Sequence, residues 1–155
     1  RLNCHLTQRS GDIALGIPFN IAAYSMLTHA VAQEVGMEVG TFGHTIVDAH
    51  IYCGQHERGS WYDDNLESLQ SQLETVSEKS EYLDVREWLV ENAPAERDGE
   101  ERYDHVPGLL TQLSREPRSR PQLSMADKPL DELSHDDFEL LEYDADDGIR
   151  FSVAE

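Results

Sequence analysis

Residues 2–7 alternate between apolar and polar side chains, which is the period of a β-strand with one buried face. Its apolar positions begin with Leu2, Cys4 and Leu6. The pattern predicts a strand that ends near Arg9 and Ser10, where binding groups often collect. Cys4 falls on the apolar face, so we interpret its thiol as inert packing rather than as a nucleophile.

A helical period follows the strand. Apolar side chains recur every three or four residues and predict a helix whose apolar face is core, on Phe19, Ala22, Ala23, Met26, Leu27, Ala30, Val31 and Val35. We expect residues 16–18 (Gly-Ile-Pro) to break the chain before this helix, Asn20 to open it and Gly36 to end it. His29 and Gln33 fall on its predicted solvated side.

Residues 39–53 are rich in β-branched and aromatic side chains and predict two short strand runs. Asp48, His50 and Tyr52 follow one another at period two, so they would share one face. Three polar groups on an otherwise apolar strand are costly to bury unless they meet partners. A hydrogen-bond network fits them, whereas a metal site at Asp48 and His50 lacks a second cluster of ligands.

Residues 54–103 are acidic and contain two amphipathic patterns. The first predicts a helix capped by Asp64 or Asn65, with its apolar side at Leu66, Leu69, Leu73 and Val76. The second predicts a helix that stops before Pro94, with its apolar side at Val85, Trp88, Leu89 and Val90. We interpret the segment as a helical hairpin with a polar turn over residues 93–102. Trp61 and Trp88 could form a partner site, but a solvated surface is the favoured interpretation.

The last third of the chain predicts one short helix and two short strands. The helix is indicated by Leu109, Leu110 and Leu113. The strands are indicated by Leu123 with Met125, and by Phe138, Leu140 and Tyr143. Ser134 and Asp137 have the spacing of a helix capping box, but the alternation that follows them favours a strand.

The charge balance limits the partners of this chain. It has 31 acidic and 12 basic residues and a net charge of −19, a surface that repels nucleic acids and anionic membranes. Lys79 and Lys128 are the only lysines, and acids occur throughout, which is typical of adaptation to high salt. Two cysteines form no disulfide framework, and no signal peptide or apolar span is present, so we expect a cytoplasmic location. Because the chain starts without methionine and directly in a strand pattern, we interpret it as the C-terminal part of a longer protein.

Candidate binding chemistry gathers in residues 8–20. Arg9 and Ser10 suit a phosphate, because a guanidinium fork binds two oxygens at once. Gly11 allows a bend and a close backbone approach, and Asp12 can accept from an amino or imide group. Asn20 carries a donor and an acceptor and can pair with a pyrimidine edge. The alternative is a surface ion pair between Arg9 and Asp12, with Asn20 as a helix cap.

Several ungapped blocks, in order, resemble the thymidylate synthase family. They are residues 8–20, Gly40-Thr41-Phe42, Asp48-Ala49-His50-Ile51-Tyr52, Gln112-Leu113-Ser114-Arg115-Glu116-Pro117-Arg118 and Tyr143-Asp144. The resemblance implies an α+β fold with a mixed β-sheet packed on a long buried helix. It assigns residues 1–53 and 104–155 to the C-terminal part of the catalytic domain and leaves residues 54–103 as an acidic, helical insertion. The family's Tyr-x-Asn-His pattern is then split between Tyr52 and Asp104-His105, which leaves the role of His105 open.

The resemblance also implies a reaction, the reductive methylation of dUMP with 5,10-methylenetetrahydrofolate as methylene and hydride donor and with no metal. It implies dUMP contacts at Arg9, Ser10, Gly11, Asp12, Asn20, His50, Ile51 and Tyr52, with His50 and Tyr52 on the sugar hydroxyl. It implies folate contacts at Asp12, Gly16 and Ala154, the last on a tail in which Asp146, Asp147 and Glu155 depart from the family pattern.

The family's nucleophilic cysteine lies in a Pro-Cys-His segment expected upstream of Arg1, and Cys4 matches a structural position. We therefore expect no turnover by these residues alone, and a homodimer formed through the sheet face. Two rivals are a deoxypyrimidine-nucleotide hydroxymethylase of the same fold and a non-catalytic nucleotide-binding or dimerisation module. Asn20 argues against the dCMP version of the hydroxymethylase, in which an aspartate is expected.

Overall fold

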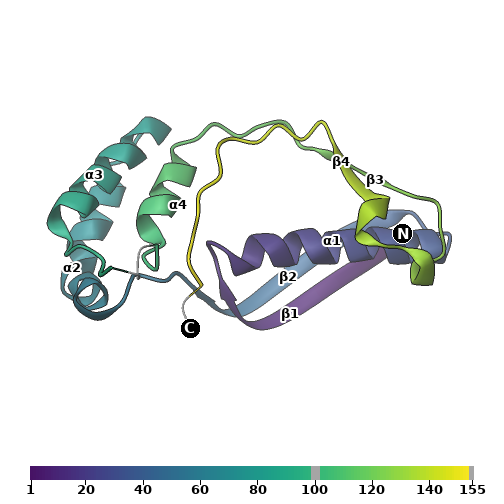
Figure 1. Ribbon diagram of the computed structural model, residues 1–155, viewed down its shortest axis with the longest axis horizontal. Coiled ribbons are helices and arrows are strands. Elements are labelled where there is room, and N and C mark those ends of the chain that lie inside the picture. Colours follow the sequence, from purple (N-terminus) through teal and green to yellow (C-terminus); the bar gives the residue numbers. More distant parts are fainter. Residues whose placement is uncertain (99–101, 154–155) are drawn as a thin grey trace. The chain divides into compact units, whose positions relative to one another are not determined.

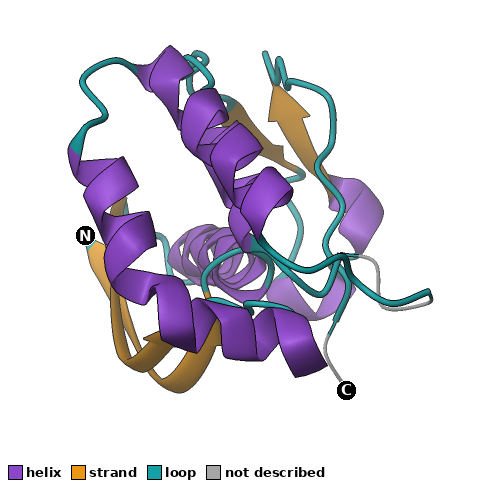
Figure 2. Ribbon diagram, turned by 90° about the vertical axis from the view of Figure 1, so that its left-hand side faces the viewer, coloured by secondary structure: helices purple, strands orange, loops and turns teal. Residues whose placement is uncertain are grey.

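The chain forms two compact units, each built from two stretches of sequence. A computed structural model describes residues 1–98 and 102–153. The first unit comprises Arg1–His50 and Arg118–Asp146, and the second comprises Ile51–Pro117 and Asp147–Glu155. Within the described residues, the four strands belong to the first unit and helices α2 to α4 to the second (Figures 1 and 2). The α+β class predicted from the sequence is therefore confirmed.

The first unit begins with a strand, a helix and a second strand. β1 (Leu2–Asp12) and β2 (Val39–His50) are parallel, and α1 (Gly16–Glu34) connects them and lies along the pair (Figure 1). The register pairs Ser10 with Asp48 and Asp12 with His50. β2 is one strand rather than the two short runs predicted, because its β-branched pattern continues without a break. It ends at His50, so Tyr52 lies beyond the alternation that would have put it on the same face.

Helix α1 begins four residues before Asn20, which corrects two predictions. The carboxylate of Asp12 accepts hydrogen bonds from the backbone amides of Ala14, at 3.0 Å, and Leu15, at 3.1 Å, and leads the chain into the helix. Pro18 then lies in the first turn, where its missing N–H costs no helical hydrogen bond. Residues 16–18 therefore start the helix instead of breaking the chain. Gly36 follows its end with φ +64°, as predicted.

The two-stranded sheet covers only one side of α1. Thr28, Ala30 and Ala32 are the buried residues of the helix. The predicted core stripe is open at both ends in this chain, since Phe19 is 70% exposed and Val35 is 55% exposed. The predicted stripe and the buried side therefore differ, because a sheet of two strands is too narrow to cover every apolar position of the helix.

Gln33, predicted to be solvated, instead ties α1 to the later part of the first unit. Its Nε2 donates to the carbonyl oxygens of Ala126, at 3.0 Å, and Lys128, at 3.1 Å. That region contains β3 (Gln122–Met125) and β4 (Phe138–Leu141), which pair antiparallel, and two short helices, η2 (Leu130–Glu132) and η3 (His135–Asp137). Both short strands predicted for this part of the chain are therefore present, but β4 ends at Leu141 and Tyr143, predicted to belong to it, lies beyond its end.

A capping box precedes β4, contrary to the prediction that the strand pattern excludes one. Ser134 and Asp137 exchange side-chain to backbone hydrogen bonds around the single turn of η3. The strand starts at the next residue, Phe138. Both sequence signals are correct, because one closes a three-residue turn and the other begins only after it.

The second unit is a small helical core. It contains α2 (His56–Glu74), η1 (Lys79–Glu81), α3 (Tyr82–Asn92) and α4 (Val106–Leu113). α3 and α4 agree with the predicted helices, whereas α2 begins well before the predicted caps at Asp64 and Asn65. The buried apolar residues are Tyr62, Leu69, Val85, Leu89, Ala93 and Leu110.

The two tryptophans of the second unit pack together rather than facing solvent. The rings of Trp61 and Trp88 lie 5.9 Å apart, centroid to centroid, and both are partly buried against the helical core. The two rings thus contribute to the helical core, and the interpretation of the segment as a solvated surface stays a prediction. No helix in the described part of the chain is long and apolar enough to cross a membrane.

Candidate functional site

A glutamine joins the predicted binding residues of β1 to those of α1. Gln8 donates from Nε2 to the Ser10 carbonyl oxygen, at 2.7 Å, and to Oδ1 of Asn20, at 3.1 Å. Its Oε1 accepts from Nε2 of His44 at 3.0 Å. With its oxygen held in this way, Asn20 keeps an amide nitrogen that bonds to no other group in the described residues. Gln8 was given no role from the sequence; the signal was a polar residue on the half-buried side of a strand.

Gly11 provides a close approach and no bend. It lies inside β1, opposite Ala49, and is buried. A Cβ at this position would lie 3.0 Å from Cγ1 of Ile17 and 3.2 Å from Nε2 of Gln8. Glycine is therefore needed here so that the start of α1 and the Gln8 amide can lie against the strand, whereas the predicted sharp bend is absent.

Ser10, Asp48 and His50 form a small polar cluster at the carboxyl ends of the two strands. Ser10 Oγ lies 3.3 Å from Asp48 Oδ2 and 3.5 Å from His50 Nδ1, and that nitrogen lies 3.6 Å from Asp48 Oδ2. A catalytic triad needs the histidine to bridge serine and carboxylate through its two different nitrogens. Here one nitrogen faces both partners, so the cluster is a polar surface and not an activated serine.

The Arg9 side chain lies on the face of the β1–β2 sheet opposite to that of Ser10. Successive side chains of a strand point to opposite faces, and Arg9 belongs to the exposed series with Asn3, His5 and Thr7, whereas Ser10 is half-buried. The Arg9 guanidinium has no hydrogen bond or ion pair within the described residues, and the surface ion pair with Asp12 considered above does not form among them. Arg9 is thus a cation available to an anionic ligand.

Tyr52 and His105 lie together in the second unit, although a long stretch of sequence separates them. Cys53 and Asp104 form an isolated antiparallel β-bridge, and the backbone N–H of His105 donates to the carbonyl oxygen of Tyr52 at 2.9 Å. The Tyr52 and His105 rings meet edge to face, with centroids 5.3 Å apart. Ile51, which precedes them, is 41% exposed.

His105 also contacts the C-terminal segment of the chain. It is completely buried, and its Nε2 donates to the carbonyl oxygen of Ser152 at 2.9 Å. The Phe151 ring lies 4.8 Å from the His105 ring, and the Ser152 N–H donates to the Arg102 carbonyl oxygen at 3.0 Å. Ala154, the predicted folate contact, lies outside the described residues.

A buried carboxylate anchors this arrangement from the neighbouring position. Oδ2 of Asp104 accepts from Arg58 Nε and from the Tyr62 hydroxyl, each at 2.7 Å, and Oδ1 accepts from the Val106 N–H at 3.0 Å. Burial, then the charge of Asp104 and its hydrogen bond, raise the pKa of Tyr62 well above its usual value. Burial, together with the nearby Asp104 charge, also raises the pKa of the Cys53 thiol.

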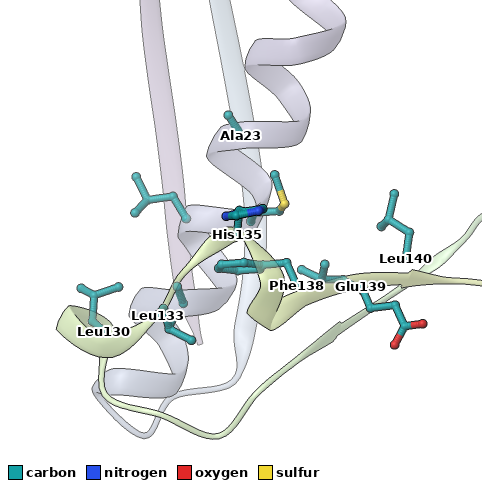
Figure 3. A pocket seen from close by; sticks show the side chains of 11 residues that line it. Ala23, Leu130, Leu133, His135, Phe138, Glu139 and Leu140 are labelled. Carbon is teal, nitrogen blue, oxygen red and sulfur yellow. The ribbon is translucent and has the colours of Figure 1, made fainter.

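An open apolar hollow of about 610 Å³ lies in the first unit, apart from these polar groups (Figure 3). The carboxylate of Glu139 points away from the apolar side chains that line it (Figure 3). They include Ala23, Met26, Leu27, Leu133, Phe138 and Leu140. Among the described residues of this lining, His135 and Glu139 are the polar or charged side chains. No group of three or more metal-binding side chains occurs in the described part of the chain.

Comparison with known proteins assigns the family. The sequence model of thymidylate synthase matches residues 1–155, which is the whole chain. The chain belongs to the thymidylate synthase family. It is 66% identical over 154 residues to a thymidylate synthase of Haloferax volcanii, covering 99% of this chain and 45% of that relative.

A solved structure shows the same thymidylate synthase fold. The thermostable thymidylate synthase A from Bacillus subtilis matches with a TM-score of 0.56 and 25% identity, over 96% of this chain and 37% of the other. The chain thus spans less than half the length of these two thymidylate synthases. The resemblance identified from short sequence blocks is confirmed at the level of family and fold.

Proposed function

We propose that these residues form the nucleotide-holding part of a thymidylate synthase that methylates dUMP to dTMP with 5,10-methylenetetrahydrofolate. The observation that carries the proposal is the amide of Asn20, which Gln8 orients at 3.1 Å. An amide that offers its N–H outward beside its own oxygen matches O4 and N3–H of uracil. Cytosine presents the opposite polarity at these positions, so a fixed amide discriminates between the two bases.

The phosphate would bind near the carboxyl ends of β1 and β2. Ser10 offers a hydroxyl there, and Arg9 offers a guanidinium without a protein partner in the described residues. Because the two side chains leave opposite faces of the strand, Arg9 must curl around the strand to share an anion with Ser10. The Arg9 side chain is long enough for this, and a charge-assisted fork on phosphate is among the stronger hydrogen-bonded pairs.

The remaining contacts are proposed from the family resemblance and their chemistry. Gly11 and Asp12 complete the loop around the nucleotide, and His50, Ile51 and Tyr52 hold the sugar. Asp12, Gly16 and Ala154 contact the folate. The Asp12 carboxylate receives two backbone N–H groups, and a carboxylate oxygen can accept more than one hydrogen bond, so a pterin contact is compatible with its capping role. Folate supplies the one-carbon unit and the hydride, and this chain's residues bind and orient the reactants.

We also propose a homodimer formed through the sheet face opposite α1. That face is exposed in the first unit, where Val47 is 74% exposed and Val39 is 38% exposed. Exposed apolar side chains between threonines suit a protein interface better than water. In such an enzyme we propose that the nucleophilic thiol comes from a part of the protein that this chain does not span, since the chain covers 45% of the Haloferax volcanii relative.

The test uses a family-length chimera in which residues 1–155 replace the matching stretch of the Haloferax volcanii relative. We expect it to consume dUMP and methylenetetrahydrofolate and to release dTMP and dihydrofolate. Asn20→Ala and Arg9→Gln should reduce kcat/KM for dUMP by roughly tenfold or more, while Lys79→Gln, which removes an exposed ion pair with Glu116, should not. Release of 5-hydroxymethyl-dUMP would identify a hydroxymethylase, and absence of dUMP binding would overturn the proposal.

A further inference from the structure

We propose that His105 is a positioning residue that couples the sugar contact at Tyr52 to the C-terminal segment, residues 147–153. The inference rests on the proposed function, in which Tyr52 binds the deoxyribose. It extends that function, because it makes nucleotide binding and the seating of the C-terminal segment dependent on each other through one buried side chain.

His105 contacts both partners directly and within the second unit. On one side its backbone N–H holds the Tyr52 carbonyl oxygen at 2.9 Å, and the two rings meet edge to face. On the other side its Nε2–H holds the Ser152 carbonyl oxygen at 2.9 Å, and its ring lies against Phe151. His105 thus joins Tyr52 and the C-terminal segment, in each case through a hydrogen bond and a ring contact.

The surroundings keep His105 from moving independently. It is fully buried, and the preceding residue, Asp104, is held by Arg58 and Tyr62 from α2. The following residue, Val106, begins α4 and donates its N–H to Asp104. A side chain in a close-packed interior transmits a displacement to its neighbours instead of absorbing it. A displacement of the Tyr52 ring therefore displaces His105, and with it Phe151 and Ser152.

The C-terminal segment is also packed closely against α4, the helix that follows His105. A Cβ on Gly108 would lie 2.5 Å from Phe151 Cε1 and 3.0 Å from Ile149 Cγ2. The segment thus lies directly on the α4 backbone with no room between them. Coupling between two ligands is reciprocal, so a folate seated under the segment must tighten dUMP by the factor by which dUMP tightens folate.

The test measures that factor in the family-length chimera. Affinity for dUMP is determined by calorimetry with and without saturating dihydrofolate, and the ratio of the two Kd values reports the coupling. His105→Phe keeps the ring against Tyr52 and Phe151 but loses the hydrogen bond to Ser152. His105→Gln keeps an amide donor at about the Nε2 position but loses the ring. We expect each variant to reduce the ratio roughly fivefold or more, within the usual range of allosteric coupling.

Leu89→Val provides the matched control. Leu89 and His105 are the two largest fully buried side chains of the described chain, and Leu89 belongs to the apolar helical core around Tyr62 and Val85. We expect this variant to lose thermal stability while keeping the coupling ratio. If both His105 variants fail to fold, Phe151→Leu removes the same ring contact from the other partner and must lower the ratio in their place.

The outcomes distinguish a failure of the role given to His105 from a failure of the proposed function. A chimera that makes dTMP and keeps its coupling ratio in all folded variants overturns the role of His105 and leaves the proposed function intact. A chimera that does not bind dUMP overturns both. Loss of the ratio in Leu89→Val to the same extent as in the His105 variants would mean that coupling follows general stability, which also overturns the inference.

Discussion

The side chain of Gln8 on β1 donates a hydrogen bond from Nε2 to Oδ1 of Asn20 on α1, with 3.1 Å between the two atoms. The same nitrogen donates to the Ser10 carbonyl oxygen, and His44 donates to the other end of the Gln8 amide. The orientation of the Asn20 amide is therefore set by a network and is not free to flip. Gly11 makes this possible, since a Cβ there would press on the Gln8 nitrogen.

Replacing Gln8 by glutamate should weaken selection for uracil. A carboxylate has nearly the same shape but cannot donate to Asn20, so the amide loses its fixed orientation. In the chimera we expect a loss of about 1 kcal/mol in dUMP binding, the usual contribution of one hydrogen bond, and a smaller preference for dUMP over dCMP. Calorimetry with both nucleotides measures this, and an unchanged preference would show that Gln8 does not orient Asn20.

Replacing Asp104 by asparagine should destabilise the second unit strongly. The Arg58 and Asp104 side chains are 8% and 1% exposed, and breaking a buried ion pair leaves an uncompensated charge, which typically costs about 3–5 kcal/mol. Urea unfolding followed by tryptophan fluorescence reports the loss through Trp61 and Trp88. The control is Lys79→Gln, because its ion pair with Glu116 is exposed and such pairs contribute about 0–1 kcal/mol. Equal losses in both variants would contradict the prediction.

Asp137 should make the first unit less stable at low pH. The hydrogen bond from Lys128 and those from the backbone and side chain of Ser134 lower its pKa from 3.8 to about 2. A carboxylate whose folded pKa is depressed stabilises the fold above the unfolded pKa and loses that contribution as the pH falls. The loss should therefore occur between about pH 4 and pH 2.

NMR titration of the Asp137 carboxyl carbon measures that pKa directly. Lys128→Ala should move the midpoint upward toward 3.8, because the first contributor to the shift has been removed. Lys79→Ala, which removes the other lysine, should leave it unchanged. A midpoint near 3.8 in the unsubstituted protein would contradict the prediction.

Replacing Gly108 by alanine should displace the C-terminal segment. The added methyl group would lie 2.5 Å from Phe151 Cε1, closer than any stable contact, so the segment must move away from α4. We expect faster proteolysis after Arg150 and a raised KM for methylenetetrahydrofolate in the chimera, with a smaller change in dUMP affinity. Gly16→Ala is the control for proteolysis, because its nearest neighbour would be an ordinary contact at 3.9 Å. Equal proteolysis of both variants would show that the segment is not seated on Gly108.

Short-range sequence patterns were sufficient to predict an element where the pattern lies within that single element. Alternation predicted β1, β3 and β4, helical period predicted α3 and α4, and Gly36 marked the end of α1. The predictions failed where a neighbouring group changed the boundary. Asp12 caps the backbone ahead of Gly16 and so brings Pro18 into the first helical turn, and no pattern inside residues 16–18 shows that a capping carboxylate precedes them.

By itself the sequence determined the α+β class, the family and the residue types that suit a phosphate and a pyrimidine, because these depend on local periodicity and on ordered blocks of residues. Tertiary structure decided which of those residues meet. The register of β1 and β2 places Ser10 beside Asp48 and His50. The antiparallel bridge between Cys53 and Asp104 places His105 against Tyr52. The reason is physical: contacts between residues far apart in sequence depend on register and packing of whole elements, and no local pattern encodes that spacing.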